Sequence, residues 1–136
     1  MEPGSVRRLL ASARVAHLGT LRPDGAPHLV PICLALDGNT LYSAVDHKRK
    51  RTTGLQRLVN IEADPRVCVL ADHYDEDWTQ LWWARADGLA RIVAVDEPEH
   101  VRAVELLLDR YPQYRDAPAL GTAIAVEVTR WTGWEA

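Results

Sequence analysis

The sequence predicts a mainly β protein with flanking helices, arranged as a small antiparallel barrel. Short alternating apolar segments recur along the 136 residues, a length typical of one domain. Several of these segments are joined by short links with turn chemistry, such as Asp37-Gly38-Asn39, which is typical of antiparallel neighbours. A parallel sheet would need a helix after each strand, and the chain offers too few. We therefore expect a single domain over residues 1–136.

The N-terminal third predicts one helix and three strands. Residues 3–13 have apolar side chains at helical spacing and are expected to form an amphipathic helix. Strands are expected at 15–20, 27–36 and 40–45, with a turn at Arg22-Pro23-Asp24-Gly25 after the first. Pro31 has no N–H to donate, so it indicates a sheet edge or a bulge within the second strand.

The rest of the chain predicts two helices between further strands. Thr53 and Gln56 have capping-box spacing and open a helix that stops at Asp64-Pro65. A strand follows at 66–73. Segments 79–86 and 89–95 flank Asp87-Gly88 and form either one kinked strand or a hairpin. Asp96 is expected to cap the last helix, with Pro98 in its first turn. The final strand is expected at 122–131.

Composition excludes several classes of protein. Hydrophobic residues make up 47% and charged residues 26%, which is ordinary for a globular chain. No apolar run approaches the roughly 20 residues of a membrane helix, and the N-terminus does not read as a secretory signal. Cys33 and Cys68 cannot build a disulfide framework. We expect a reduced, cytoplasmic protein, and the reactivity of either thiol stays open.

A compact basic cluster stands out in the charge pattern. Lys48-Arg49-Lys50-Arg51 leaves a net charge of −7 on the rest of a chain whose total is −3. A general nucleic-acid binder would spread its cations along a face, so the cluster is either a local anion site or a solvated turn. It follows a strand and precedes a helix, where a phosphate would meet cations and free N–H groups together. The hydroxyl groups of Ser43 and Thr52 would add donors, and Arg57 lies one turn inside the helix.

Tryptophan is concentrated in two short segments of a chain that contains no Phe. Five Trp residues fall within 78–83 and 131–134. The neighbours Trp82 and Trp83 point to opposite faces of a strand, so both cannot enter one core. The remaining ring is left for a subunit interface, a planar ligand or solvent.

The other polar residues give no catalytic motif. His17 and His28 are expected on adjacent strands, either satisfied within the core or paired across the strands. No spacing of His, Cys, Asp or Glu matches a zinc or iron site. Nucleophile-elbow, P-loop and GxGxxG patterns are missing from the sequence, so hydrolase and kinase functions have no positive support.

The order of these segments resembles a known family. The stretch 16–28, which contains Thr20-Leu21-Arg22-Pro23-Asp24-Gly25-Ala26-Pro27-His28, is followed by Val30-Pro31-Ile32, the basic cluster, Asn60 and Asp64-Pro65-Arg66-Val67. This order resembles the pyridoxamine-phosphate-oxidase-like split β-barrel superfamily over about residues 6–134. Asp77-Trp78 and Leu81-Trp82-Trp83 resemble the branch that binds the deazaflavin coenzyme F-420.

The resemblance implies a six-stranded antiparallel split barrel that forms a homodimer, with two cofactor sites at the subunit interface that each use residues of both chains. The cofactor phosphate would be held by Lys48, Lys50, Arg51 and Arg57. Relatives carry a Lys where this chain has Arg57, so which cation holds the phosphate stays open. The ring would lie against Val30, Pro31 and Ile32, with Trp82 and Trp83, and Trp131 or Trp134, completing the pocket.

The chemistry implied by the resemblance is hydride transfer from reduced F-420 to an electron-poor organic acceptor. Because the cofactor carries the reactive carbon, no catalytic side chain and no metal are expected. Three alternatives remain: an FMN-binding oxidoreductase on the same scaffold, a non-catalytic cofactor-binding protein, and a barrel for single-stranded nucleic acid. The acidic balance outside the basic cluster argues against the last, and we expect neither a nucleic-acid nor a membrane partner.

Overall fold

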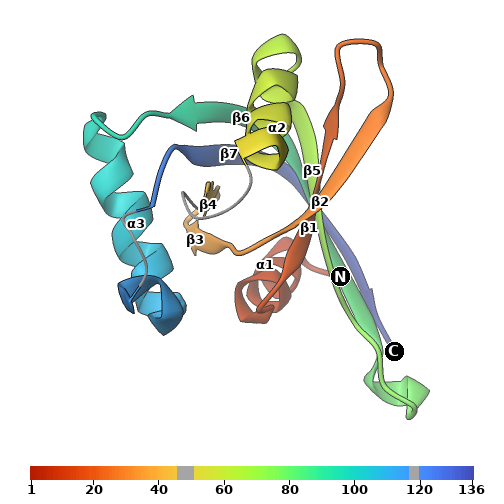
Figure 1. Ribbon diagram of the computed structural model, residues 1–136. Helices are drawn as coiled ribbons and strands as arrows, with labels where there is room; N and C mark the ends of the chain where they lie inside the picture. The colour runs from red at the N-terminus through yellow and green to blue at the C-terminus, as the bar shows by residue number, and fades with distance from the viewer. Residues whose placement is uncertain (46–50, 117–119) are drawn as a thin grey trace.

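The computed structural model describes residues 1–45, 51–116 and 120–136, and for residues 51–55 the backbone alone. Within this part of the chain, three α-helices surround a seven-stranded antiparallel sheet with the order β2-β1-β5-β6-β7-β4-β3 (Figure 1). The helices are α1 (Pro3–Ser12), α2 (Arg51–Ala63) and α3 (Pro98–Arg110). The strands are β1 (Ala16–Leu21), β2 (Pro27–Ile32), β3 (Ala35–Asp37), β4 (Thr40–Ala44), β5 (Arg66–His73), β6 (Trp82–Val93) and β7 (Ala123–Glu135).

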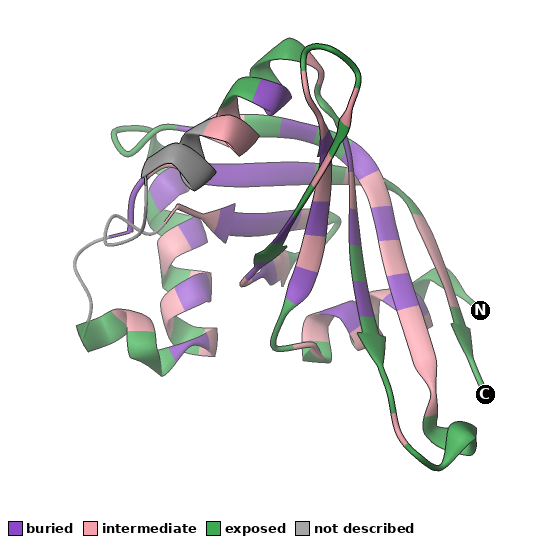
Figure 2. Ribbon diagram, turned by 45° about the vertical axis from the view of Figure 1, so that its right-hand side comes forward, coloured by how far each residue is buried: buried purple, intermediate pink, exposed green. Residues whose placement is uncertain are grey.

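The sheet curls because its two edge strands are consecutive in the chain. β2 and β3 lie at opposite edges, yet only Cys33 and Leu34 separate them. Three residue steps span at most about 10 Å, so the ends of the two edges must approach each other. The result is a partly open barrel around one core, which agrees with the expected mainly β split barrel with flanking helices (Figure 2).

The expected count of six strands is wrong, because residues 27–36 form two strands. Residues 27–32 pair with β1, whereas 35–37 pair with β4 at the other edge. Leu34 lies fully buried between them, and its N–H donates to the hydroxyl of Tyr111 at 3.0 Å. Pro31 does lie in an edge strand, as its missing N–H indicates.

β6 is one continuous strand with a kink, which settles the alternative left open by Asp87-Gly88. It pairs with β7 along its whole length, and the register shifts between Asp87 and Gly88. A Cβ at Gly88 would overlap the carbonyl oxygen of Glu127, so glycine permits the close approach of the two strands. The expected strand start at residue 79 is wrong, because Trp78–Gln80 form a 3-10 helix.

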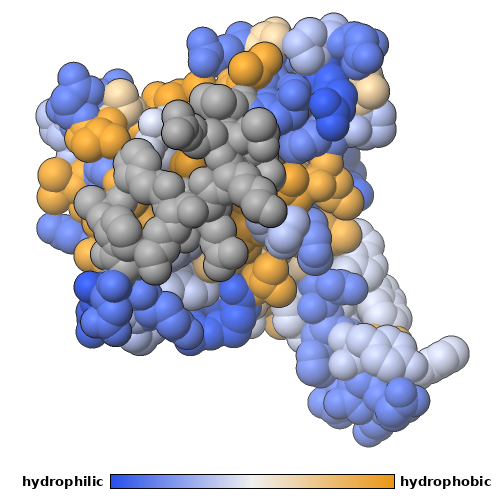
Figure 3. All heavy atoms as spheres, viewed as in Figure 1, coloured by the Kyte–Doolittle hydropathy of each residue, from blue (hydrophilic) through white to orange (hydrophobic). Residues whose placement is uncertain are grey.

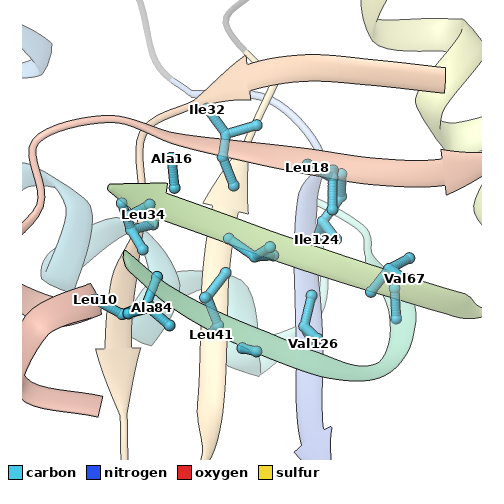
Figure 4. Packing of buried hydrophobic residues seen from close by; sticks show 14 of the residues in the cluster. Leu10, Ala16, Leu18, Ile32, Leu34, Leu41, Val67, Ala84, Ile124 and Val126 are labelled. Atoms are coloured by element: carbon cyan, nitrogen blue, oxygen red, sulfur yellow. The ribbon is translucent and has the colours of Figure 1, made fainter. Parts of the chain in front are cut away.

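The main core fills the inside of the curled sheet. Strand side chains that face inward include Leu18, Leu41, Val69 and Ile124, all at most 1% exposed, and Figure 4 shows several of them in contact across strands. α1 contributes Val6 and Leu10, as its spacing predicts, and covers one end of this core against β6 and β7.

A second apolar region lies between α3 and the β3–β4 edge. Ala103 and Leu107 of α3 are fully buried there. Tyr42 and Val93, on the strands, are 4% and 1% exposed. Two expected caps are wrong. Glu97, not Asp96, precedes α3, and its carboxylate accepts from the N–H of Ala94 at 2.6 Å. Thr53 lies inside α2 and not before it.

None of the described helices is long and apolar enough to span a membrane.

Candidate functional site

A buried polar contact joins α2 to the β1–β2 hairpin. Asn60 is fully buried, and its amide Nδ2 donates to the hydroxyl of Thr20 at 2.9 Å. One turn earlier, Gln56 Nε2 donates to Asn60 Oδ1 at 2.7 Å. Buried polar groups need such partners, so the contact fixes which face of α2 is turned towards the hairpin.

Arg57 lies next to Gln56 on this helix and has a nitrogen without a partner. Its Nε is buried and makes no hydrogen bond. Burial lowers the pKa of Arg57, and the electrostatic interaction with Tyr114 raises it to a smaller extent. A guanidinium remains charged in proteins nonetheless. The structure thus holds a cation with a buried, unused N–H donor, an arrangement that costs free energy unless an acceptor binds there.

His28 is a second polar group in the same region with a buried, unpartnered atom. It lies opposite Thr20 in the β1–β2 ladder, and its Nδ1 is buried without a hydrogen bond. Burial lowers the pKa of His28 first, and the charges of Arg22 and Arg57 lower it further. His28 is therefore close enough to both guanidinium groups to feel their charges.

These three side chains form what we call the cationic end: Arg22, His28 and Arg57. The nearest acidic residue in the hairpin turn, Asp24, uses its Oδ1 to accept from the N–H of Ala26 at 3.0 Å. Hydrophilic residues gather at the top of the molecule in Figure 3, over α2 and the hairpin. Two guanidinium groups beside an imidazole, with an unused N–H donor on Arg57, suit an anion such as a phosphate.

The predicted phosphate residues fall mostly outside the region whose side chains are described. Lys48 and Lys50 lie outside the described residues, and Arg51 and Thr52 begin α2 with only their backbone described. Ser43 lies in the middle of β4 and is 3% exposed, on the same side of the strand as Leu41. Of the basic residues predicted to hold the phosphate, Arg57 is the one whose side chain the structure describes.

The residues expected to line a ring divide between the two faces of β2. The side chains of Val30 and Ile32 belong to the core, whereas Pro31 is exposed on the outer face. Any ring next to this strand would therefore meet Pro31 and backbone atoms and not the other two side chains. Pro31 is also opposite His17, so of the two alternatives for His17 and His28 the pairing across the strands is wrong.

Trp82 and Trp83 point to opposite faces of β6, as their adjacency predicts. Trp82 packs against the core, and its ring is stacked on His73 with centroids 6.1 Å apart. Trp83 lies on the other face, where the guanidinium of Arg85 is 5.8 Å from the ring centroid. Trp131 packs against the core as well, whereas Trp134 is 47% exposed.

One chain does not bring the Trp82–Trp83 pair and the cationic end together. Trp82 begins β6. α2 contacts the same strand further along, where Ala90, Arg91 and Ile92 line an open groove with Ile61 and Glu62 of the helix. The eight residues from Trp82 to Ala90 correspond to about 27 Å of strand. Figure 1 likewise shows α2 at one end of the sheet and the β5–β6 connection at the other.

The outer face of β2, β1 and β5 carries an apolar strip. Leu29 is 67% exposed and Leu70 is 38% exposed. The strip also includes Pro31 and the half-buried Cys68. Gly19 lies between Leu29 and Cys68 in the ladder. An exposed patch of this kind is typical of a protein-protein or ligand contact.

Sequence reasoning missed His28 and Arg22 as candidate site residues. Both belong to the Thr20–His28 motif that carries the family resemblance, but nothing in their spacing shows that His28 lacks a partner. That information comes from the folded structure, in which His28 Nδ1 is buried and makes no hydrogen bond. Among the described residues, no group of His, Cys, Asp and Glu could hold a metal ion.

A curled antiparallel sheet with flanking helices and a cationic end beside a helix defines a small β-barrel protein suited to an anionic ligand. The family described as pyridoxamine 5′-phosphate oxidase matches residues 3–135, and the chain belongs to this family. A search of curated proteins found no match.

Solved structures with the same fold carry different names. A conserved hypothetical protein of Mycobacterium tuberculosis is 25% identical, with a TM-score of 0.77 over 99% of this chain and 85% of its own. A FAD-binding protein of Mesorhizobium loti is 19% identical, with a TM-score of 0.75 over 100% and 96%. The heme storage protein of Vibrio cholerae is 11% identical, with a TM-score of 0.71 over 97% and 92%. The last two likenesses show the fold alone.

Proposed function

We propose that this protein is a cytoplasmic homodimer that binds a phosphate-bearing cofactor of the flavin class and uses it to transfer hydride to a small electron-poor organic acceptor. The observation that carries the proposal is the unpartnered Nε of Arg57 in the cationic end. A phosphate oxygen would supply the missing acceptor, and a charge-assisted bond there is stronger than a neutral one. The residues present therefore fit the phosphate of such a cofactor.

The division of the expected site between two ends of the sheet supports the homodimer. Within a single chain, Arg57 and the Trp82–Trp83 pair lie far apart. In a homodimer, the tryptophans of each chain would lie at the cationic end of the other chain. The exposed strip with Leu29 and Leu70 offers an apolar surface for that second copy. A two-fold interface of this kind would give two equal sites.

The protein's own contribution would be binding and orientation. Arg57 holds the phosphate, Pro31 and the β2 backbone contact the ring, and a tryptophan of the second copy excludes water. The bound cofactor supplies the hydride chemistry itself. Cys33 and Cys68 are free thiols, which agrees with a reducing compartment, although neither has a role in this proposal.

Two ligands share the required phosphate and ring chemistry. The similarity to the FAD-binding protein of Mesorhizobium loti favours a flavin, whereas the resemblance of residues 77–83 to the deazaflavin branch favours F-420. We place the flavin first because it is supported by proteins of the same fold.

The experiment is a binding titration on the purified dimer with FMN, FAD, F-420 and haem, followed by an acceptor panel of enones and quinones. The proposal expects FMN, FAD or F-420 to bind more tightly than haem and the reduced form to be oxidised by at least one acceptor. Tight binding without oxidation by any acceptor would make the protein a carrier, and preferential binding of haem would overturn the flavin-class assignment.

A further inference from the structure

His28 is the group in the cationic end that the proposed cofactor site leaves unexplained. Its Nδ1 is buried without a partner, and its side chain lies on the core-facing side of β2, in line with the buried Val30 and Ile32. A buried polar atom of this kind normally has a hydrogen-bond partner. Among the described side chains, two buried nitrogens thus lack a hydrogen-bond partner, one on His28 and one on Arg57.

The arrangement around His28 is fixed from two elements. Thr20 lies opposite His28 in the ladder and accepts from Asn60 on α2. Arg57 is three residues before Asn60 on the same helix and therefore lies on a neighbouring part of the helix face. The hydrogen bond between Thr20 and Asn60 therefore fixes the position of Arg57, on the helix, relative to His28, on the hairpin.

Among the side chains that the structure describes, the charged groups that act on His28 have one sign. Arg22 comes from the hairpin turn and Arg57 from α2, and both act on the imidazole. Asp24 on the turn is exposed and bonded to the N–H of Ala26, while Thr20, Gln56 and Asn60 are neutral. In the absence of an anion, burial and, to a smaller extent, the two guanidinium groups lower the pKa of His28 and favour the neutral imidazole.

We propose that His28 is an anion-binding residue, which takes up a proton from solvent when a phosphate or sulfate group binds between it and Arg57. The anion cancels the repulsion from Arg22 and Arg57 and accepts a hydrogen bond from the imidazolium. Both nitrogens without partners are then satisfied by one ligand. This inference rests on the proposed function only for the identity of the anion, which would be the cofactor phosphate.

Proton uptake has a definite consequence for affinity. The imidazole of free His28 has a pKa below its usual value, and a bound dianion raises that pKa. By linkage, the anion binds more tightly at low pH and loses affinity as the pH rises through the raised pKa. A rise of one pKa unit corresponds to about tenfold in affinity.

The test measures the titration of His28 directly, by NMR of the imidazole Cε1–H signal, with the signal identified from its loss in His28→Gln. Sulfate is the probe because it stays a dianion from pH 5 to 8, and chloride at equal ionic strength is the control for screening. We expect sulfate to raise the His28 pKa by about one unit and to bind about tenfold more weakly at pH 8 than at pH 5.

Two variants and the cofactor itself separate the possible results. Arg57→Gln should abolish the effect of sulfate on His28, whereas Arg102→Gln on α3, whose guanidinium pairs with Asp37, should leave it intact. An unchanged His28 pKa with both sulfate and FMN overturns this inference, even if FMN binds. A His28 pKa raised by sulfate in a protein that binds neither FMN nor F-420 would uphold the anion site and overturn the proposed function.

Discussion

Asn60 on α2 donates a hydrogen bond of 2.9 Å to the hydroxyl of Thr20 on β1, and both side chains are buried. This contact connects the helix that carries Arg57 with the hairpin that carries His28. The geometry of the cationic end therefore depends on a neutral hydrogen bond at its centre and on no ion pair among these residues.

Asn60→Ala should destabilise the fold and weaken anion binding together. The substitution leaves the Thr20 hydroxyl and the Gln56 amide without their partner, which costs about 1–3 kcal/mol of unfolding free energy. Urea denaturation checks the stability, and Asn39→Ala at an exposed turn is the control, expected within about 0.5 kcal/mol of the wild type. Equal stability of the two variants would contradict the role of the buried amide.

Tyr42 gives a pH dependence at the alkaline end. Its hydroxyl donates to Glu99 at 2.6 Å, and burial together with this carboxylate raises the pKa of Tyr42 to about 12. An unfolded tyrosine ionises near pH 10. The contribution of Tyr42 is therefore fully present below pH 10 and is lost as the pH rises towards 12, because the unfolded chain releases its proton first.

A spectrophotometric titration at 295 nm of the wild type and Tyr42→Phe checks this prediction. The difference between the two curves should have its midpoint near 12. The variant should also lose stability less steeply between pH 10 and 12. A difference curve centred near 10, the value of a free tyrosine, would show that the contact with Glu99 does not hold the phenol.

Gly88→Ala should destabilise the kinked strand β6. A Cβ at this position would overlap the carbonyl oxygen of Glu127 on β7, so the two strands would have to separate at the point where their register shifts. We expect a loss of about 1–3 kcal/mol in thermal or urea unfolding. Gly4→Ala is the matched control, since the nearest atom to its Cβ is 3.6 Å away, and it should lose nothing.

Leu29→Asp should convert the proposed dimer to a monomer. Leu29 is 67% exposed on the outer strip, so the chain itself loses little packing, whereas a carboxylate buried between two copies would be costly. Sedimentation velocity measures the change, with Leu89→Asp, at an exposed site on β6, as control. A wild-type protein that sediments as a monomer would contradict the homodimer.

The sequence predicts the helices and most strand positions because their periodicity is local. Val6 and Leu10 are buried as spacing predicts, and the Trp82–Trp83 pair divides between two faces. The division of residues 27–36 into two strands was not predictable in this way, because it depends on which distant strand each half pairs with.

The candidate site could be predicted only in part, for the same reason. The place of Arg57 in the family motif makes it a candidate from the sequence. That Arg57 Nε and His28 Nδ1 are buried without partners follows from the packing between α2 and the hairpin. A residue type and a spacing do not show whether a nitrogen has a partner. The basic residues Lys48 and Lys50 stay a prediction, since they lie outside the described residues.

The most direct test of the account compares FMN with riboflavin, which has the same ring without the phosphate, in isothermal titration of the wild type and Arg57→Gln. A hydrogen bond to a charged group contributes about 1.5–3 kcal/mol. The wild type should therefore bind FMN at least about tenfold more tightly than riboflavin, and the variant should lose most of that difference while its stability is kept. Equal affinity of the wild type for the two ligands, or an undiminished preference in Arg57→Gln, would contradict the claim that the cationic end holds a cofactor phosphate.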